Sequence, residues 1–116
     1  DAKKNELMSL LQKLKRDGKS IAGYGASGRA NTMIQFCEID ASLIDYMIDD
    51  APAKQGFYTP GSHILIQPSS ILDTDQKPDY LLIFAWSFLD EISKKNTKYI
   101  ESGGKLIVPL PEVSLI

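Results

Sequence analysis

The sequence has very little of the residues that build disulfide frameworks and metal centres. It holds a single cysteine, Cys37, and a single histidine, His63. One cysteine excludes an internal disulfide, and one residue of each kind is too few for a zinc site built from Cys and His ligands. A lone cysteine also suits a reducing compartment, so we expect a cytoplasmic protein that binds no metal.

Long apolar runs and an excess of one charge are also missing. No run approaches the roughly 18 apolar residues that suggest a transmembrane helix, and no signal-peptide pattern opens the chain. Thirteen Lys and Arg against fifteen Asp and Glu give a net charge of −2, without the basic excess of nucleic-acid-binding proteins. We therefore expect neither a membrane nor a nucleic acid as partner. Because the chain begins at Asp1 rather than Met, we expect it to be a fragment of a longer protein.

What remains is the composition of an ordinary globular protein, with 43% hydrophobic and 24% charged residues. A chain of 116 residues has the usual size of one domain and buries about two-thirds of its surface on folding. Such burial supplies a core without disulfides or metal ions. We therefore expect residues 1–116 to form a single domain.

Short apolar strands alternate with amphipathic helices along the chain. The patterns predict helices over residues 2–16, 30–37 and 88–101, a short helix opening at Pro68, and strands over 20–24, 43–48, 63–66, 80–85 and 105–108. Alternation of this kind forms right-handed βαβ units around a parallel sheet. The predicted fold is α/β, a Rossmann-like three-layer α/β/α domain of about five mainly parallel strands in the order 3-2-1-4-5.

The most informative segment is a glycine-rich turn between the first predicted strand and the second predicted helix. It reads Gly23-Tyr24-Gly25-Ala26-Ser27-Gly28. This matches G-x-G-x-x-G in the strand–turn–helix context that the pattern requires. Unpaired N–H groups and the helix dipole favour a phosphate at such a helix start, where Ser27 and Arg29 could add hydrogen bonds. The alternative is a turn whose glycines serve backbone geometry and packing alone.

Three other segments are candidates for the same ligand. Asp49 follows the second predicted strand, where a carboxylate either binds a ribose hydroxyl or caps a turn. The loop over residues 54–63 carries a cation, an amide, a phenol and an imidazole; it either grips a nucleotide or sugar or is a solvated connection. Trp86 follows the fourth strand and either stacks on a base or sugar or packs in the core.

Three further groups have less specific interpretations. His63 is a weak candidate for proton transfer, because no Cys or Ser partner stands at a recognisable spacing. Cys37 is expected to pack on an apolar helix face. The lysines over residues 94–98 are expected to form a solvated helix face.

Several separated blocks of residues support a more specific interpretation. They are Gly23-Tyr24-Gly25-Ala26 with Asn31-Thr32, Lys54-Gln55-Gly56-x-Tyr58-x-Pro60-Gly61, Leu82-x-x-Ala85-Trp86, Gly103-Gly104-Lys105 and Val108-Pro109-x-Pro111. Together these blocks resemble the C-terminal domain of S-adenosylmethionine-dependent sugar C-methyltransferases, from about residue 17 to residue 111. The resemblance implies a parent transferase with a zinc-binding amino-terminal piece, a central domain that binds S-adenosylmethionine, and this Rossmann-like domain.

The resemblance also implies what each part binds. This domain would bind a nucleotide-linked deoxysugar, with dTDP or a similar nucleotide, and would hold no cofactor itself. S-adenosylmethionine would belong to the neighbouring domain of the same chain, so this fragment would be catalytically incomplete alone. From the residues alone, an NAD(P)-binding domain and a non-catalytic interaction module remain alternatives.

Carried over residue by residue, the resemblance assigns three groups of site residues. They are Gly25, Ala26, Asn31 and Thr32 at the glycine turn, Lys54, Gln55, Tyr58 and Pro60 in the sugar–nucleotide loop, and Trp86 after the fourth strand. The chain departs from the family pattern at two positions. Arg29 stands where lysine is frequent, which keeps the charge but changes the geometry of a phosphate contact. Ser87 stands where asparagine is frequent, which removes an amide and puts sugar specificity in question.

Overall fold

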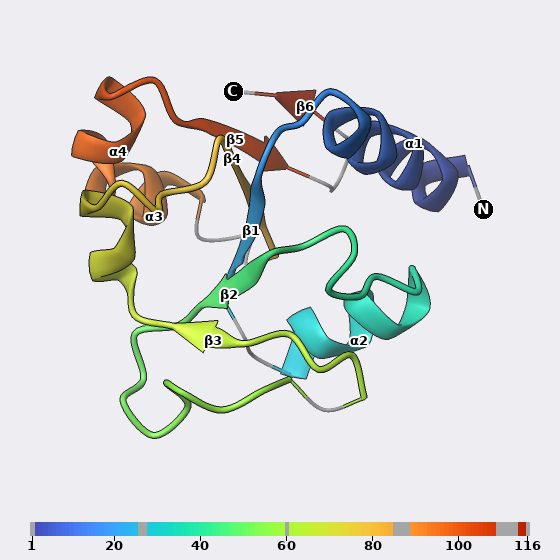
Figure 1. The fold of residues 1–116 in the computed structure, drawn as a ribbon, viewed down its shortest axis with the longest axis horizontal. Helices are drawn as coiled ribbons and strands as arrows, with labels where there is room; N and C mark the ends of the chain where they lie inside the picture. Colours follow the sequence, from blue (N-terminus) through green and yellow to red (C-terminus); the bar gives the residue numbers. More distant parts are fainter. Residues whose placement is uncertain (1, 26–27, 60, 85–88, 109–113, 116) are drawn as a thin grey trace.

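A parallel sheet forms the centre of the molecule. A computed structural model describes residues 2–25, 28–59, 61–84, 89–108 and 114–115. Its strands are β1 (Ile21–Tyr24), β2 (Tyr46–Ile48), β3 (Ile66–Gln67), β4 (Tyr80–Ile83), β5 (Lys105–Val108) and β6 (Ser114–Leu115). Within the described residues they lie in the order β3-β2-β1-β4-β5-β6 (Figure 1). The predicted order of five parallel strands is confirmed, and β6 adds an antiparallel strand beside β5.

Helices cover both faces of this sheet. They are α1 (Ala2–Arg16), α2 (Gly28–Phe36), the 3₁₀ helix η1 (Ser69–Asp73), α3 (Leu89–Lys95) and α4 (Thr97–Glu101). Figure 1 shows α1 and α2 on one side of the sheet and α3 and α4 on the other. The three-layer Rossmann-like arrangement predicted from the sequence is therefore confirmed.

Each face of the sheet has its own hydrophobic core, and β4 with the residue after it contributes to both. Leu82 and Phe84 pack on the side of α1 and α2, whereas Leu81 and Ile83 pack on the side of η1, α3 and α4. All four side chains are 0–1% exposed. This explains why the fourth strand has an unbroken apolar run, because successive side chains point to opposite and equally buried faces.

The predicted helix over residues 88–101 is wrong in one respect, since α3 and α4 are separate helices. Asn96 lies between them, buried, and its amide Nδ2 donates to the Ile92 carbonyl at 2.9 Å. Asparagine side chains that bond to nearby backbone compete with the regular helix. A local side-chain contact thus divides a segment whose apolar periodicity is continuous.

The predicted third strand over residues 63–66 is displaced, because much of that segment forms an antiparallel hairpin. Residues 56–59, called the hairpin arm below, pair with the chain that enters β3. The Ile66 N–H donates to the Phe57 carbonyl at 2.8 Å, and the Thr59 N–H to the Ile64 carbonyl at 2.8 Å. His63 adopts a φ of 55° in the turn of this hairpin, so it does not begin a strand.

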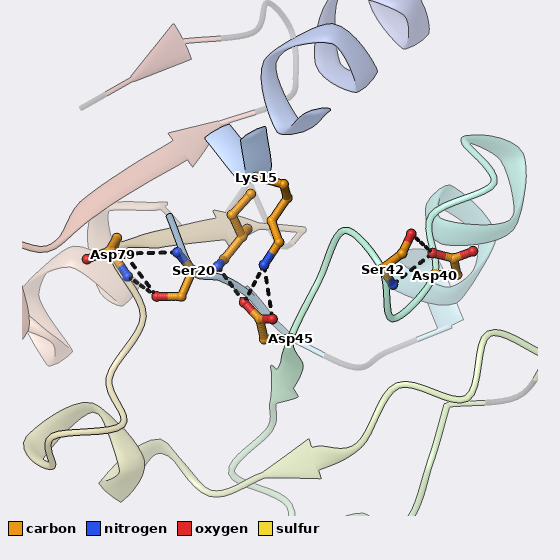
Figure 2. Close-up of polar contacts among 7 residues, drawn as sticks. Lys15, Ser20, Asp40, Ser42, Asp45 and Asp79 are labelled. Carbon is orange, nitrogen blue, oxygen red and sulfur yellow. Dashed lines mark hydrogen bonds and ion pairs between the residues drawn. The ribbon is translucent and has the colours of Figure 1, made fainter. Parts of the chain in front are cut away.

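Two aspartates bind backbone groups at the amino-terminal ends of the central strands (Figure 2). The Asp79 carboxylate accepts the Ser20 N–H at 2.8 Å and the Ser20 hydroxyl at 3.1 Å. The Asp45 carboxylate accepts the Ile21 N–H at 2.9 Å and pairs with the Lys15 ammonium at 3.0 Å. These contacts fix the start of β1 to the segments that enter β4 and β2.

The Asp79 contact predicts an acid dependence of stability. The hydrogen bond from the Ser20 backbone N–H lowers the pKa of Asp79 below its ordinary value. A carboxyl group with a lowered folded-state pKa stabilises the fold above its unfolded pKa, and this stabilisation is lost as the pH falls through the folded pKa. We expect Asp79→Asn, which keeps an acceptor oxygen but does not titrate, to lose less melting temperature than the wild type between about pH 7 and about pH 3.

Thermal melts followed by circular dichroism would measure this difference. Asp75→Asn, in the exposed turn before Asp79, is the matched control and should follow the wild type. An Asp79→Asn melting temperature that falls as steeply with acid as that of the wild type would show that this carboxylate does not carry the effect.

Candidate functional site

The glycine turn lies where β1 ends and the chain enters α2. Gly25 has a φ of 94°, in the left-handed region that favours glycine, and its N–H donates to the Ile48 carbonyl at 2.7 Å. The predicted strand–turn–helix context is therefore present. Ala26 and Ser27 lie outside the described residues. Gly28, Arg29 and Asn31 are placed in the first turns of α2 by their backbone.

Gly23 has a different part in the structure, because it lies inside β1. A Cβ atom at this position would be 2.3 Å from the Met47 sulfur and 2.7 Å from Cε2 of Phe84. The missing side chain thus makes room for the core on the α1 and α2 side. One glycine of the motif is required by packing whether or not a ligand binds the turn.

A cavity of about 330 Å³ opens at the carboxyl ends of β1 and β2. It is lined by Tyr24, Gly25, Ile48, Asp49, Asp50, Glu91, Ile92 and Lys95. Open α/β sheets bind ligands at this edge, and small-molecule sites have volumes of about 300–1,000 Å³. The structure thus brings three residues of the predicted site, Tyr24, Gly25 and Asp49, to one cavity.

The loop after β2 folds back onto Asp49. The Asp49 carboxylate accepts the Ala51 N–H at 2.8 Å and lies 3.5 Å from the Lys54 ammonium. The Gln55 amide donates to the Asp49 backbone carbonyl at 3.0 Å. Lys54 and Gln55 therefore join the same edge of the sheet as the glycine turn. Asp49 caps a turn, as the alternative interpretation holds, and its contact with a ribose stays a prediction.

Other predicted site residues lie away from the cavity. Tyr58 is exposed on the hairpin arm, and His63 is exposed at the hairpin turn. A Cβ atom on Gly61 in that turn would lie 3.7 Å from Gln35, near the carboxyl end of α2 and remote from its glycine-turn end. Thr32 is exposed on α2. The structure therefore does not bring Tyr58 and His63 to the cavity, and their roles stay predictions.

Two further predicted residues lie beyond what the structure describes. Pro60, from the loop, and Trp86, after β4, lie outside the described residues. Their assignments rest on the sequence alone.

A polar network that the sequence analysis missed occupies one wall of the cavity. The Lys95 ammonium pairs with Oδ2 of Asp50, and the Tyr24 hydroxyl donates to the same oxygen at 3.4 Å. Glu91 lies one helical turn before Lys95 and lines the same cavity. Part of this network could have been predicted from the four-residue spacing of Glu91 and Lys95, because that spacing places both on one face of a helix.

The electrostatics of this network keep its central pair charged. Partial burial alone would raise the pKa of Asp50, but hydrogen bonds from Lys95, Ser69 and Tyr24 outweigh it and lower the pKa. The hydrogen bond to Asp50 in turn raises the pKa of Lys95. Both groups are therefore ionised at neutral pH.

Two negative findings apply to the part of the chain that the structure describes. No group of at least three His, Cys, Asp or Glu side chains is arranged to hold a metal ion there. No helix in the same residues combines the length and apolar character needed to cross a membrane.

Comparison with known proteins agrees with the resemblance drawn from the separated sequence blocks. Residues 1–111 match the family described as the C-methyltransferase C-terminal domain. The chain is also 34% identical over 111 residues to the C-methyltransferase NovU of Streptomyces niveus, and this match covers 96% of the chain and 26% of NovU. The chain thus spans about a quarter of the length of this relative. It therefore belongs to the family of C-methyltransferase C-terminal domains.

Proposed function

We propose that this domain binds the nucleotide-linked deoxysugar substrate of an S-adenosylmethionine-dependent C-methyltransferase. The observation that carries the proposal is the cavity at the carboxyl edge of the sheet, where Gly25 and Asp49 meet beside the start of α2. The Lys54 and Gln55 contacts to Asp49 add a cation and an amide to the same edge. Family membership supports the methyltransferase part of the proposal.

The chemistry of a nucleotide-sugar suits this edge. Its diphosphate would lie at the amino-terminal end of α2, because the N–H groups of a helix start and the helix dipole attract an anion. Its hydroxyl groups would find a carboxylate acceptor in Asp49. The domain would thereby hold the sugar in place for a reaction whose other participants are bound elsewhere.

We place the methyl donor outside this chain. S-adenosylmethionine supplies a methyl group from its sulfonium centre. The cavity of about 330 Å³ is near the lower end of small-molecule site volumes, and we assign it to the sugar substrate alone. Most of NovU lies outside the matched region, and the corresponding part of the parent protein is where we expect the donor and the catalytic base.

Titration of the 116-residue chain with dTDP-glucose tests the proposal. We expect amide chemical shifts to change at Gly25, at residues 28–32 and at Asp49, because the ligand would contact these segments directly. Binding should be weak in isolation, since the neighbouring domain would complete the site. S-adenosylhomocysteine is the control and should leave these amides unchanged.

Other outcomes favour other functions. Saturating dTDP-glucose and UDP-glucose without a shift at the glycine turn would contradict the proposal. Enhanced NADH fluorescence together with indifference to nucleotide-sugars would indicate an NAD(P)-binding domain. A melting temperature unaltered by all of these ligands would favour an interaction module, because a ligand that binds the folded state raises the melting temperature.

A further inference from the structure

Lys95 lies at the end of α3 and lines the same cavity as Gly25 of the glycine turn. The sequence predicts that it lies, with Lys94 and Lys98, on a solvated helix face. Its side chain is indeed 56% exposed, but its ammonium pairs with Asp50 at the carboxyl end of β2. Among the described residues that line this cavity, Lys95 is the only basic one. Among the described lining residues, a diphosphate in the cavity would therefore meet Lys95 as the one cation, with Lys54 beside Asp49 at the same edge of the sheet.

Asp50 does not depend on Lys95 alone. The Tyr24 hydroxyl donates to the oxygen that accepts from Lys95, and the Ser69 side chain also hydrogen-bonds Asp50. The Asp50 side chain is 38% exposed, so water reaches it as well. If Lys95 moved away, Asp50 would keep two donors and its solvent, unlike a carboxylate in a fully buried ion pair. Breaking this partly exposed pair therefore costs little free energy.

The lysine side chain is suited to such a move. Its ammonium is a compact charge on a flexible stem with three rotatable donors. Phosphate oxygens accept charge-assisted hydrogen bonds, and a lysine beside a glycine-rich turn is a common phosphate partner. The other charged groups on the cavity wall, Asp49, Asp50 and Glu91, are acidic and would repel a diphosphate. A cation that turns toward the anion would offset this repulsion.

We propose that Lys95 exchanges partners, from Asp50 in the free domain to the diphosphate of the bound nucleotide-sugar. The inference rests on the proposed function, and it adds a residue from α3 to the binding site. Asp50 then acts as a competitor of the ligand for Lys95 and holds the ammonium at the cavity until the ligand arrives.

Binding constants of four forms of the 116-residue chain test the exchange. The forms are the wild type, Lys95→Met, Lys94→Met and Asp50→Asn, each titrated with dTDP-glucose and, separately, with thymidine. We expect Lys95→Met to weaken dTDP-glucose binding about tenfold, since a charge-assisted hydrogen bond is lost. Lys94→Met, on the exposed helix surface, is the matched control and should bind like the wild type.

Asp50→Asn should change the affinity for dTDP-glucose in the opposite direction from Lys95→Met. Asp50→Asn should strengthen dTDP-glucose binding several-fold, because Lys95 loses its competing partner and the cavity loses a negative charge. Thymidine has no phosphate, so all four forms should bind it equally. Melting temperatures of the four forms would establish that each is folded at the temperature of the titration.

Each remaining outcome overturns the exchange. If the wild type binds dTDP-glucose at the glycine turn and Lys95→Met binds it as tightly, Lys95 does not contact the diphosphate, although the proposed function stands. If Asp50→Asn weakens binding, the Asp50–Lys95 pair is a fixed unit and the exchange is wrong. If the wild type does not bind dTDP-glucose, both the exchange and the proposed function are wrong.

Discussion

Alanine at Gly104 should lower the free energy of unfolding by about 3 kcal/mol, because its methyl group would overlap the ring of Tyr99. A Cβ atom at this position would lie 2.3 Å from both Cε2 and Cζ of that ring. Tyr99 is only 2% exposed, and its hydroxyl donates to the Pro78 carbonyl at 2.8 Å. The ring therefore cannot turn aside without losing this hydrogen bond and its place in the core.

Chemical denaturation of Gly104→Ala would measure the loss, which corresponds to a fall of roughly 10 °C in melting temperature. Gly103→Ala is a neighbouring control, because a Cβ there meets no atom within 4 Å and the change costs only the left-handed φ of 104°. The overlap is isolated by repeating Gly104→Ala in a Tyr99→Leu background, where the smaller side chain should reduce its cost. An equal cost in both backgrounds would exclude the Tyr99 ring as the cause.

Gly23→Ala should lower the free energy of unfolding by about 2–3 kcal/mol, because its methyl group would also overlap buried side chains. Its methyl group would meet the Met47 sulfur and the Phe84 ring, and both of these side chains are almost completely buried. β1 lies between β2 and β4, so hydrogen bonds on both edges prevent the backbone from moving away. Gly23→Ala should thus reduce stability even when no ligand is present.

Denaturation of Gly23→Ala with and without Met47→Val separates packing from ligand contact. The shorter valine should relieve the closest overlap, so the added cost of Gly23→Ala should fall in that background. A cost that does not change would argue against this overlap. Nucleotide binding by Gly23→Ala is informative only below its melting temperature, because unfolding would otherwise be mistaken for a lost phosphate contact.

The layers and strand order followed from local patterns that burial enforces. The apolar run over residues 80–85 predicts a strand covered on both faces. Leu7, Leu10, Leu11 and Leu14 predict the apolar stripe of α1, in which all but the partly buried Leu10 are buried. The structure departs from these predictions at one helix and at one added strand, and both departures have a physical cause. Asn96 divides a helix through its own side chain, whereas β6 has only two residues, too few to show a strand pattern in the sequence.

The candidate site was predictable where the order of the strands brings residues together. Gly25 and Asp49 follow adjacent strands, so topology alone brings them to one edge. Lys95 and Asp50 are separated by 45 residues and meet because α3 packs over the end of β2, which no local pattern contains. His63 lies in a hairpin turn that the residue pattern did not predict, and its role in proton transfer stays a prediction.

The antiparallel segments at the two sides of the parallel sheet have a consequence for behaviour at high concentration. The hairpin arm pairs with the outer side of β3, and β6 pairs with the outer side of β5. The outermost parallel strands thus offer few free main-chain donors and acceptors to a neighbouring molecule. Strand addition between molecules is a common route to aggregation, and short antiparallel covers of this kind hinder it.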